Sequence, residues 1–166
     1  VMALWKKEAS TKSVPPMPDI ALEGARVCLR PPRREDYERW IEVRGRNRTF
    51  LKPFEPTWPE NCLSHDFYER RLRRQTADWH RDLTRHFLIL RQSDDVLVGG
   101  MNINYILRGV SQSASLGYWL SEAEQGQGFM AEAIALTLHY AFTNMNLNRI
   151  NAATLLNNQR SQKLLE

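Results

Sequence analysis

One stretch, residues 116–144, constrains the fold of this chain more than any other. It begins as an apolar and aromatic strand, passes through a polar turn into Gly126-Gln127-Gly128, and continues as a helix. The apolar residues of that helix recur about every 3.6 positions, at Met130, Ile134, Leu138 and Phe142. Such a turn leaves free backbone N–H groups at the positive end of a helix dipole, and glycine lets an anion approach them closely. The stretch therefore predicts a phosphate or pyrophosphate site.

Two widespread phosphate-binding motifs fit these residues poorly. A Walker A loop requires a lysine at the start of the helix, and no lysine lies between Lys52 and Lys163. Gly126-x-Gly128-x-x-Ala131 matches the dinucleotide-binding pattern, but five residues separate it from the strand. No acidic residue follows at the expected distance of about 20 positions. A plain strand–helix connection without a ligand also fits the local sequence.

A third motif fits better. The segment Gln125-Gly126-Gln127-Gly128-Phe129-Met130 resembles the pyrophosphate loop of the GNAT superfamily of acetyl-CoA-dependent N-acetyltransferases, Gln/Arg-x-x-Gly-x-Gly/Ala, except that Met130 replaces Gly or Ala. Other segments resemble the RimJ/RimL branch of that superfamily, which acetylates protein N-termini. They are residues 117–120, Glu132-Ala133, the Asn-x-x-Ser segment within residues 157–161, and the first strand at residues 27–31. The resemblance covers residues 22–166.

The remaining sequence predicts a mixed sheet with helices. Residues 1–19 are polar and proline-rich and read as an irregular lead-in. Short turns between three central strands indicate an antiparallel meander, whereas the helix after residue 128 requires the next strand to run parallel to the last of them. The predicted strands are 25–30, 85–91, 96–107, 113–120 and 149–155, and the predicted helices are 35–44, 65–79, 129–142 and 159–166.

These elements predict an α+β domain over residues 20–166 in the order βααβββαβα. This order agrees with the GNAT fold that the resemblance implies. That fold ends with two further strands in an antiparallel hairpin, and this sequence contains neither, so we expect a C-terminally incomplete GNAT domain.

Composition narrows the class of protein. No apolar run approaches 18 residues, so we expect no membrane span, and Cys28 and Cys62 are too few for a disulfide framework. A cytoplasmic protein is the expectation. The histidines and cysteines lack the spacing of metal ligands, so we expect no metal. The net charge is +4, and arginines gather between Arg26 and Arg91, which indicates either an acidic partner or a solvated helix face.

The resemblance also implies roles for individual residues. The pantetheine arm of acetyl-CoA, the co-substrate, would lie along the main chain of Tyr118, Trp119 and Leu120, and its pyrophosphate on the 125–130 loop. Asn158 would hold the pantetheine. The position of the tyrosine acid of many GNAT enzymes is occupied by Leu165, so Ser161 would protonate the thiolate. Without the resemblance, Asn158 reads as a helix N-cap and Ser161 as a first-turn residue. The general base of the branch, a glutamate, would follow Glu166.

The predicted function is transfer of an acetyl group from acetyl-CoA to the N-terminal α-amino group of a protein, including a ribosomal protein. The amine would attack the thioester directly. We expect a peptide or protein partner, no membrane, no direct role for nucleic acid, and a monomer or dimer. Two alternatives stay open. One is acetylation of a small amine such as an amino acid or an aminoglycoside. The other is a non-enzymatic ribosome- or RNA-binding module that uses the arginines between Arg70 and Arg74.

Overall fold

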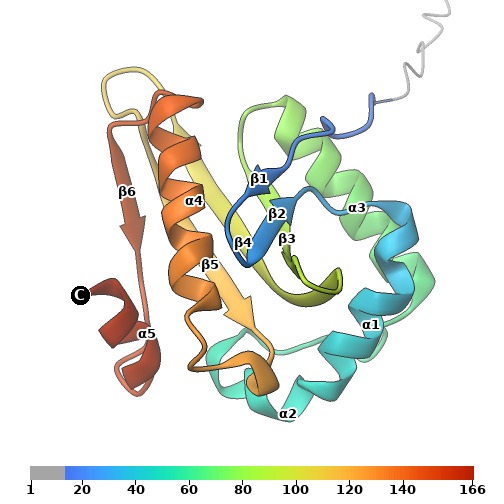
Figure 1. Cartoon of the computed structure of the whole chain (residues 1–166). Helices are drawn as coiled ribbons and strands as arrows, with labels where there is room; N and C mark the ends of the chain where they lie inside the picture. The colour runs from blue at the N-terminus through green and yellow to red at the C-terminus, as the bar shows by residue number, and fades with distance from the viewer. Residues whose placement is uncertain (1–13) are drawn as a thin grey trace, which may run out of the picture.

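The computed structural model describes residues 14–166 and contains one six-stranded sheet in the order β1-β2-β3-β4-β5-β6 (Figure 1). Neighbouring strands are antiparallel except β5 and β6, which are parallel. The strands are β1 (Leu22–Glu23), β2 (Val27–Arg30), β3 (Arg85–Arg91), β4 (Val96–Leu107), β5 (Ser113–Leu120) and β6 (Arg149–Ala152). The helices are α1 (Tyr37–Arg46), α2 (Arg48–Leu51), α3 (His65–His80), α4 (Phe129–Thr143) and α5 (Gln159–Leu165). The predicted α+β architecture is confirmed. Most of the predicted lead-in, residues 1–13, lies outside the described residues.

Three details differ from the predicted elements, each because the segment is too short for a periodic pattern. β1 is a two-residue strand that pairs with β2, and α2 is a single turn between the predicted helices 35–44 and 65–79. β6 ends at Ala152, so the last three residues of the predicted strand, 153–155, leave the sheet. None of the helices within residues 14–166 has the length and apolar character needed to cross a membrane.

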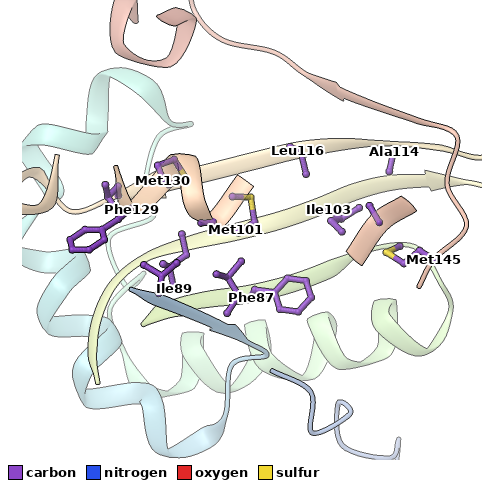
Figure 2. Packing of buried hydrophobic residues seen from close by; sticks show 14 of the residues in the cluster. Phe87, Ile89, Met101, Ile103, Ala114, Leu116, Phe129, Met130 and Met145 are labelled. Atoms are coloured by element: carbon purple, nitrogen blue, oxygen red, sulfur yellow. The ribbon is translucent and has the colours of Figure 1, made fainter. Parts of the chain in front are cut away.

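The sheet carries helices on both faces. Phe87 and Ile89 of β3 pack in the larger core with residues of α4, whereas Leu88 and Leu90 pack with residues of α1 and α3. Successive residues of a strand point to opposite faces, so α4 covers one face and α1 and α3 cover the other (Figure 1). Figure 2 shows the larger core, with side chains of β3, β4, β5 and α4 in contact.

The buried stripe of α4 differs from the predicted one. Met130 is buried as expected, but Phe142 is 44% exposed, and Ala133, Thr137 and Ala141 are fully buried. These small residues let the helix axis approach the sheet closely, while larger apolar side chains pack at its flanks. The helical period of α4 agrees with the predicted one. The side of α4 that touches the sheet carries its small residues, so the largest apolar side chains do not identify that side.

Candidate functional site

Two parallel strands separate at the centre of the molecule. β5 and β6 pair only from Ser113↔Arg149 to Leu116↔Ala152, after which the chain turns away toward α5 (Figure 1). β4 still pairs with β5 as far as Leu120. Residues 117–120 therefore have one edge with no strand partner among residues 14–166. A pocket of about 370 Å³ lies along this edge, bounded by α2, the start of α4 and α5. An extended ligand can pair with such an edge as an added strand does.

The Gly126–Gly128 turn lies beside this pocket and exposes main-chain donors. Gly126 and Gly128 have φ of 74° and 84°, a conformation that side chains rarely tolerate. Gly128 is the N-cap of α4. The N–H groups of Gly126, Gln127 and Gly128 have no acceptor among the described residues. Together with the first free N–H groups of α4, they form an anion-binding arrangement at a helix N-terminus.

Charges around this turn are held in fixed pairs. Arg26, at the start of β2, donates from Nη1 to the Gln127 carbonyl at 2.7 Å and pairs with Glu132 at 3.4 Å. Glu132 also accepts from the Arg26 N–H at 2.8 Å, and its pKa is lowered by these hydrogen bonds despite its partial burial. Glu124 is neutralised by Arg91 at 2.8 Å. Glu124 and Glu132 therefore place less uncompensated negative charge near the donors than the sequence suggests.

Tyr118 and Ser161 meet inside the pocket. Their hydroxyl oxygens lie 2.7 Å apart, and Ser161 is 8% exposed. Asn158 Oδ1 accepts from the Ser161 N–H at 3.1 Å, so Asn158 caps α5. Its Nδ2 has no partner among residues 14–166, and Asn158 lines the pocket. The capping role and a ligand role for Asn158 are therefore compatible. The contact between the Tyr118 and Ser161 hydroxyls was not predicted, because 43 residues separate them in the chain.

A buried asparagine fixes the end of β5. Asn47, between α1 and α2, is 3% exposed, and its Nδ2 donates to Ser121 Oγ at 3.1 Å. Its Oδ1 accepts from the Glu122 N–H at 2.8 Å. These bonds join the α1–α2 junction to the exit of β5, and they place Phe50, on α2, against the pocket. Asn47 was missed because nothing in its local sequence separates it from a loop residue.

A second pocket of about 410 Å³ opens on the α1/α3 face of the sheet and meets the first at Tyr118, Trp119 and Glu55. Arg44 is stacked between Trp58 and Trp119, with its Cζ 4.2 Å and 4.8 Å from the ring centroids. Its guanidinium binds the Glu55 carboxylate at 2.8 Å and 2.6 Å, and Trp58 Nε1 donates to the same group at 2.7 Å. Both oxygens of Glu55 are thus occupied. The two pockets are therefore adjacent, with three lining residues in common.

The pocket brings together most of the residues predicted for the site, from β5, the turn, α4 and α5. Those that line it are Tyr118, Trp119, Leu120, Gln125, Met130, Asn158 and Ser161. Gly126, Gln127 and Gly128 form the adjoining turn. Phe129 differs, because its side chain is 5% exposed in the core with the Arg26 guanidinium 5.0 Å from its ring centroid. Only its main-chain N–H can serve a ligand.

Comparison with known proteins places the chain among acetyltransferases. Residues 26–166 match the family described as Acetyltransferase (GNAT) domain. YjcK of Bacillus subtilis (strain 168), named a probable N-acetyltransferase, is 32% identical over 145 residues, 87% of this chain and 80% of YjcK. The [ribosomal protein uS5]-alanine N-acetyltransferase of Escherichia coli (strain K12) is 28% identical over 150 residues, 90% of this chain and 77% of that protein. Mycobacterium smegmatis RimJ, solved in complex with CoA-disulfide, has a TM-score of 0.79 and 27% identity, covering 84% of this chain and 67% of that one.

Proposed function

The chain belongs to the GNAT family of N-acetyltransferases, and on that premise we propose that it acetylates the N-terminal α-amino group of a protein, including a ribosomal protein. Acetyl-CoA is the proposed donor. The observation that carries the proposal is the unpaired edge of residues 117–120, which leads to the donors of the Gly126–Gly128 turn. The relatives that act on ribosomal proteins, by their names, support the choice of acceptor.

The residues of the pocket suit acetyl-CoA. Tyr118, Trp119 and Leu120 offer main-chain groups to the amide-bearing pantetheine arm, and the Asn158 Nδ2 can donate to the same arm. The turn and the N-terminus of α4 offer N–H groups to the pyrophosphate. The positive φ at position 128 favours glycine, which has no Cβ beside these groups. Aromatic residues of α2 and the following turn, Phe50 and Phe54, wall the pocket opposite α5.

Acetyl transfer to an amine needs a neutral amine, a polarised carbonyl and a proton for the departing thiolate. We assign the proton to Ser161, whose hydroxyl is held by the Tyr118 hydroxyl at 2.7 Å. The amine, entering from the second pocket, attacks the thioester carbon directly. As the C–N bond forms and the C–S bond breaks, Ser161 gives its proton to the departing thiolate and regains one from the ammonium that the attack produces. Glu55 is the one carboxylate that lines both pockets, and its bonds to Arg44 and Trp58 occupy it. It is therefore a poor general base and a poor receptor for the ammonium group of a small substrate, which favours the peptide over the small-amine alternative.

The test is an acetylation assay with defined acceptors. Peptides with N-terminal Ala or Ser are incubated with acetyl-CoA and the protein, and mass spectrometry locates the acetyl group. We expect modification of the α-amine only. The same peptide with a blocked N-terminus and one internal lysine is the control and should stay unmodified. Acetylation of free amino acids or an aminoglycoside, with none on the peptides, would assign the small-amine function instead.

A further inference from the structure

The second pocket contains a positive charge that no carboxylate of residues 14–166 neutralises. Arg71 of α3 lines this pocket, and it forms no ion pair with any residue from 14 to 166. The other charged residues of the lining, Arg44 and Glu55, neutralise each other. The lining therefore has a net charge of +1, which comes from Arg71.

Arg71 differs from the other arginines of its helix. Arg70, Arg73 and Arg74 are exposed, whereas Arg71 is largely covered, with its Cζ 5.6 Å from the Trp40 ring centroid. With the Gln75 amide oriented toward it, Oε1 accepts from Arg71 Nε at 3.2 Å and Nη2 at 3.3 Å. These bonds use two of the five N–H groups of the guanidinium. Burial first, and then the charges of Arg44 and Arg74, lower the pKa of Arg71, although an arginine stays protonated at neutral pH.

A second residue with a free donor lines the same pocket. Asn102 of β4 lines the pocket beside Arg71. Its Oδ1 lies 2.8 Å from His86 Nδ1, and an amide oxygen can only accept, so the imidazole donates and the Asn102 Nδ2 points elsewhere. This Nδ2 has no hydrogen-bond partner among residues 14–166. Burial lowers the pKa of His86 to about 4, so the imidazole is neutral at pH 7 and adds no charge.

Three N–H groups of the Arg71 guanidinium and the Asn102 Nδ2 therefore have no acceptor among residues 14–166, and they can bind a ligand that supplies oxygen atoms. We propose that Arg71 and Asn102 bind a carboxylate of the acceptor substrate, a proposal that rests on the proposed acetyl transfer for the identity of the pocket. A monovalent carboxylate matches the net charge of the lining, and a guanidinium binds its two oxygens in a planar, bidentate geometry. Trp40, Trp58 and Trp119 also line the pocket, and their apolar rings lower the local dielectric around such a pair.

Two sources can supply this carboxylate next to a reactive amine. One is an aspartate or glutamate side chain near the N-terminus of a peptide, and the other is the α-carboxylate of a free amino acid. Binding measurements test both sources of the carboxylate, and they do not require the protein to transfer an acetyl group. The probes are Ala-Asp-Phe amide against Ala-Asn-Phe amide, and alanine against alaninamide, titrated in the presence of CoA by calorimetry and by the fluorescence of the pocket tryptophans.

We expect one carboxylate-bearing probe to bind about 10- to 100-fold more tightly than its amide, the range for a hydrogen-bonded charged group. Arg71→Gln should abolish this preference, Arg71→Lys should restore part of it, and Asn102→Ala should weaken it. Arg74→Gln, a change of an exposed arginine on the same helix, should leave it intact. CoA binding by each variant reports that the fold is preserved.

The outcomes separate this inference from the proposed function. Equal binding of acid and amide in both pairs, or a preference that survives Arg71→Gln, would overturn the carboxylate site even if the peptides are acetylated. A preference that depends on Arg71, without acetylation of any probe, would support the site and contradict the proposed transfer. Alanine as the only discriminated ligand would support the site and assign the small-amine acceptor.

Discussion

The Tyr118–Ser161 hydroxyl pair allows a quantitative test of the proposed proton donor. Ser161→Ala removes one hydroxyl from the pocket and leaves the main-chain donors of the Gly126–Gly128 turn unchanged. We expect acetyl-CoA affinity to stay within a few-fold and kcat to fall about 10²-fold, the low end for loss of a general acid. That fall corresponds to about 2.7 kcal/mol of transition-state stabilisation.

Tyr118→Phe tests how the serine is held. It keeps the ring, which packs against the core, and removes the partner of a 2.7 Å hydrogen bond. A neutral hydrogen bond contributes about 0.5–1.5 kcal/mol, so kcat should fall about 2- to 10-fold. Because Tyr118 acts through Ser161, the double variant should be no slower than Ser161→Ala alone, which is the non-additivity of a coupled pair.

Single-turnover and steady-state kinetics are measured on the unchanged protein, on Ser161→Ala, on Tyr118→Phe and on the double variant. Tyr140→Phe is the matched control, because the Tyr140 hydroxyl has no hydrogen bond within residues 14–166 and its loss should leave kcat unchanged. An activated acyl donor whose leaving group needs no proton should shrink the effect of Ser161→Ala. If Tyr118→Phe costs more than Ser161→Ala, Tyr118 is the acid. If kcat is preserved and only acetyl-CoA affinity drops, Ser161 is a binding residue and the reasoning is wrong.

Two further predictions concern stability. Burial lowers the pKa of His86 to about 4. Between about pH 6.5 and pH 4 only the unfolded chain binds a proton at this histidine. As the pH is lowered through this range, the free energy of unfolding should therefore decrease by up to about 3 kcal/mol. His86→Asn should flatten this slope in urea titrations at a series of pH values, and a substitution of the exposed His139 should not. Asp36 is fully buried and binds Arg30 at 2.7 Å through both oxygens, so Asp36→Asn should cost about 3–5 kcal/mol by leaving a buried guanidinium unpaired. Asp19→Asn, which breaks an exposed pair with Arg33, should cost less than about 1 kcal/mol, and equal losses in urea unfolding would refute the argument.

The parts of the fold that the sequence predicted are those specified by neighbouring residues. A serine directly before a helical pattern predicts an N-cap, and Ser64 caps α3 by accepting from the Phe67 N–H. Two adjacent glycines within a strand pattern, Gly99 and Gly100, predict a bulge or a close backbone approach, and both occur. The register of β3 and β4 shifts beside them, and a Cβ on Gly100 would collide with the Trp119 indole. Such signals are local in the chain and can be read without tertiary contacts.

The parts that were missed depend on contacts between distant segments. Arg71 is one of four arginines within five residues, and nothing in the sequence distinguishes the one that points inward. Arg26 lies 101 residues before Gln127 in the chain, yet it donates to the Gln127 carbonyl in the 125–130 loop. The separation of β5 and β6 likewise follows from where the chain after Ala152 turns, which a strand propensity cannot specify. The motif therefore indicated the proposed donor site, while the pocket proposed for the acceptor required the structure.

The most direct measurement for the central claim is a calorimetric titration of CoA into the protein and into Gly128→Asp. The substitution places a Cβ and a negative charge at the turn where the pyrophosphate is proposed to bind, in a backbone conformation with φ of 84°. We predict that CoA binds, that NAD does not, and that the variant loses about 2–3 kcal/mol, roughly 30- to 150-fold in affinity. Gly109→Asp is the control, because Gly109 has a similar φ of 70° in open space and should keep full affinity. Unchanged CoA affinity in Gly128→Asp would contradict the assignment of the turn as the pyrophosphate site.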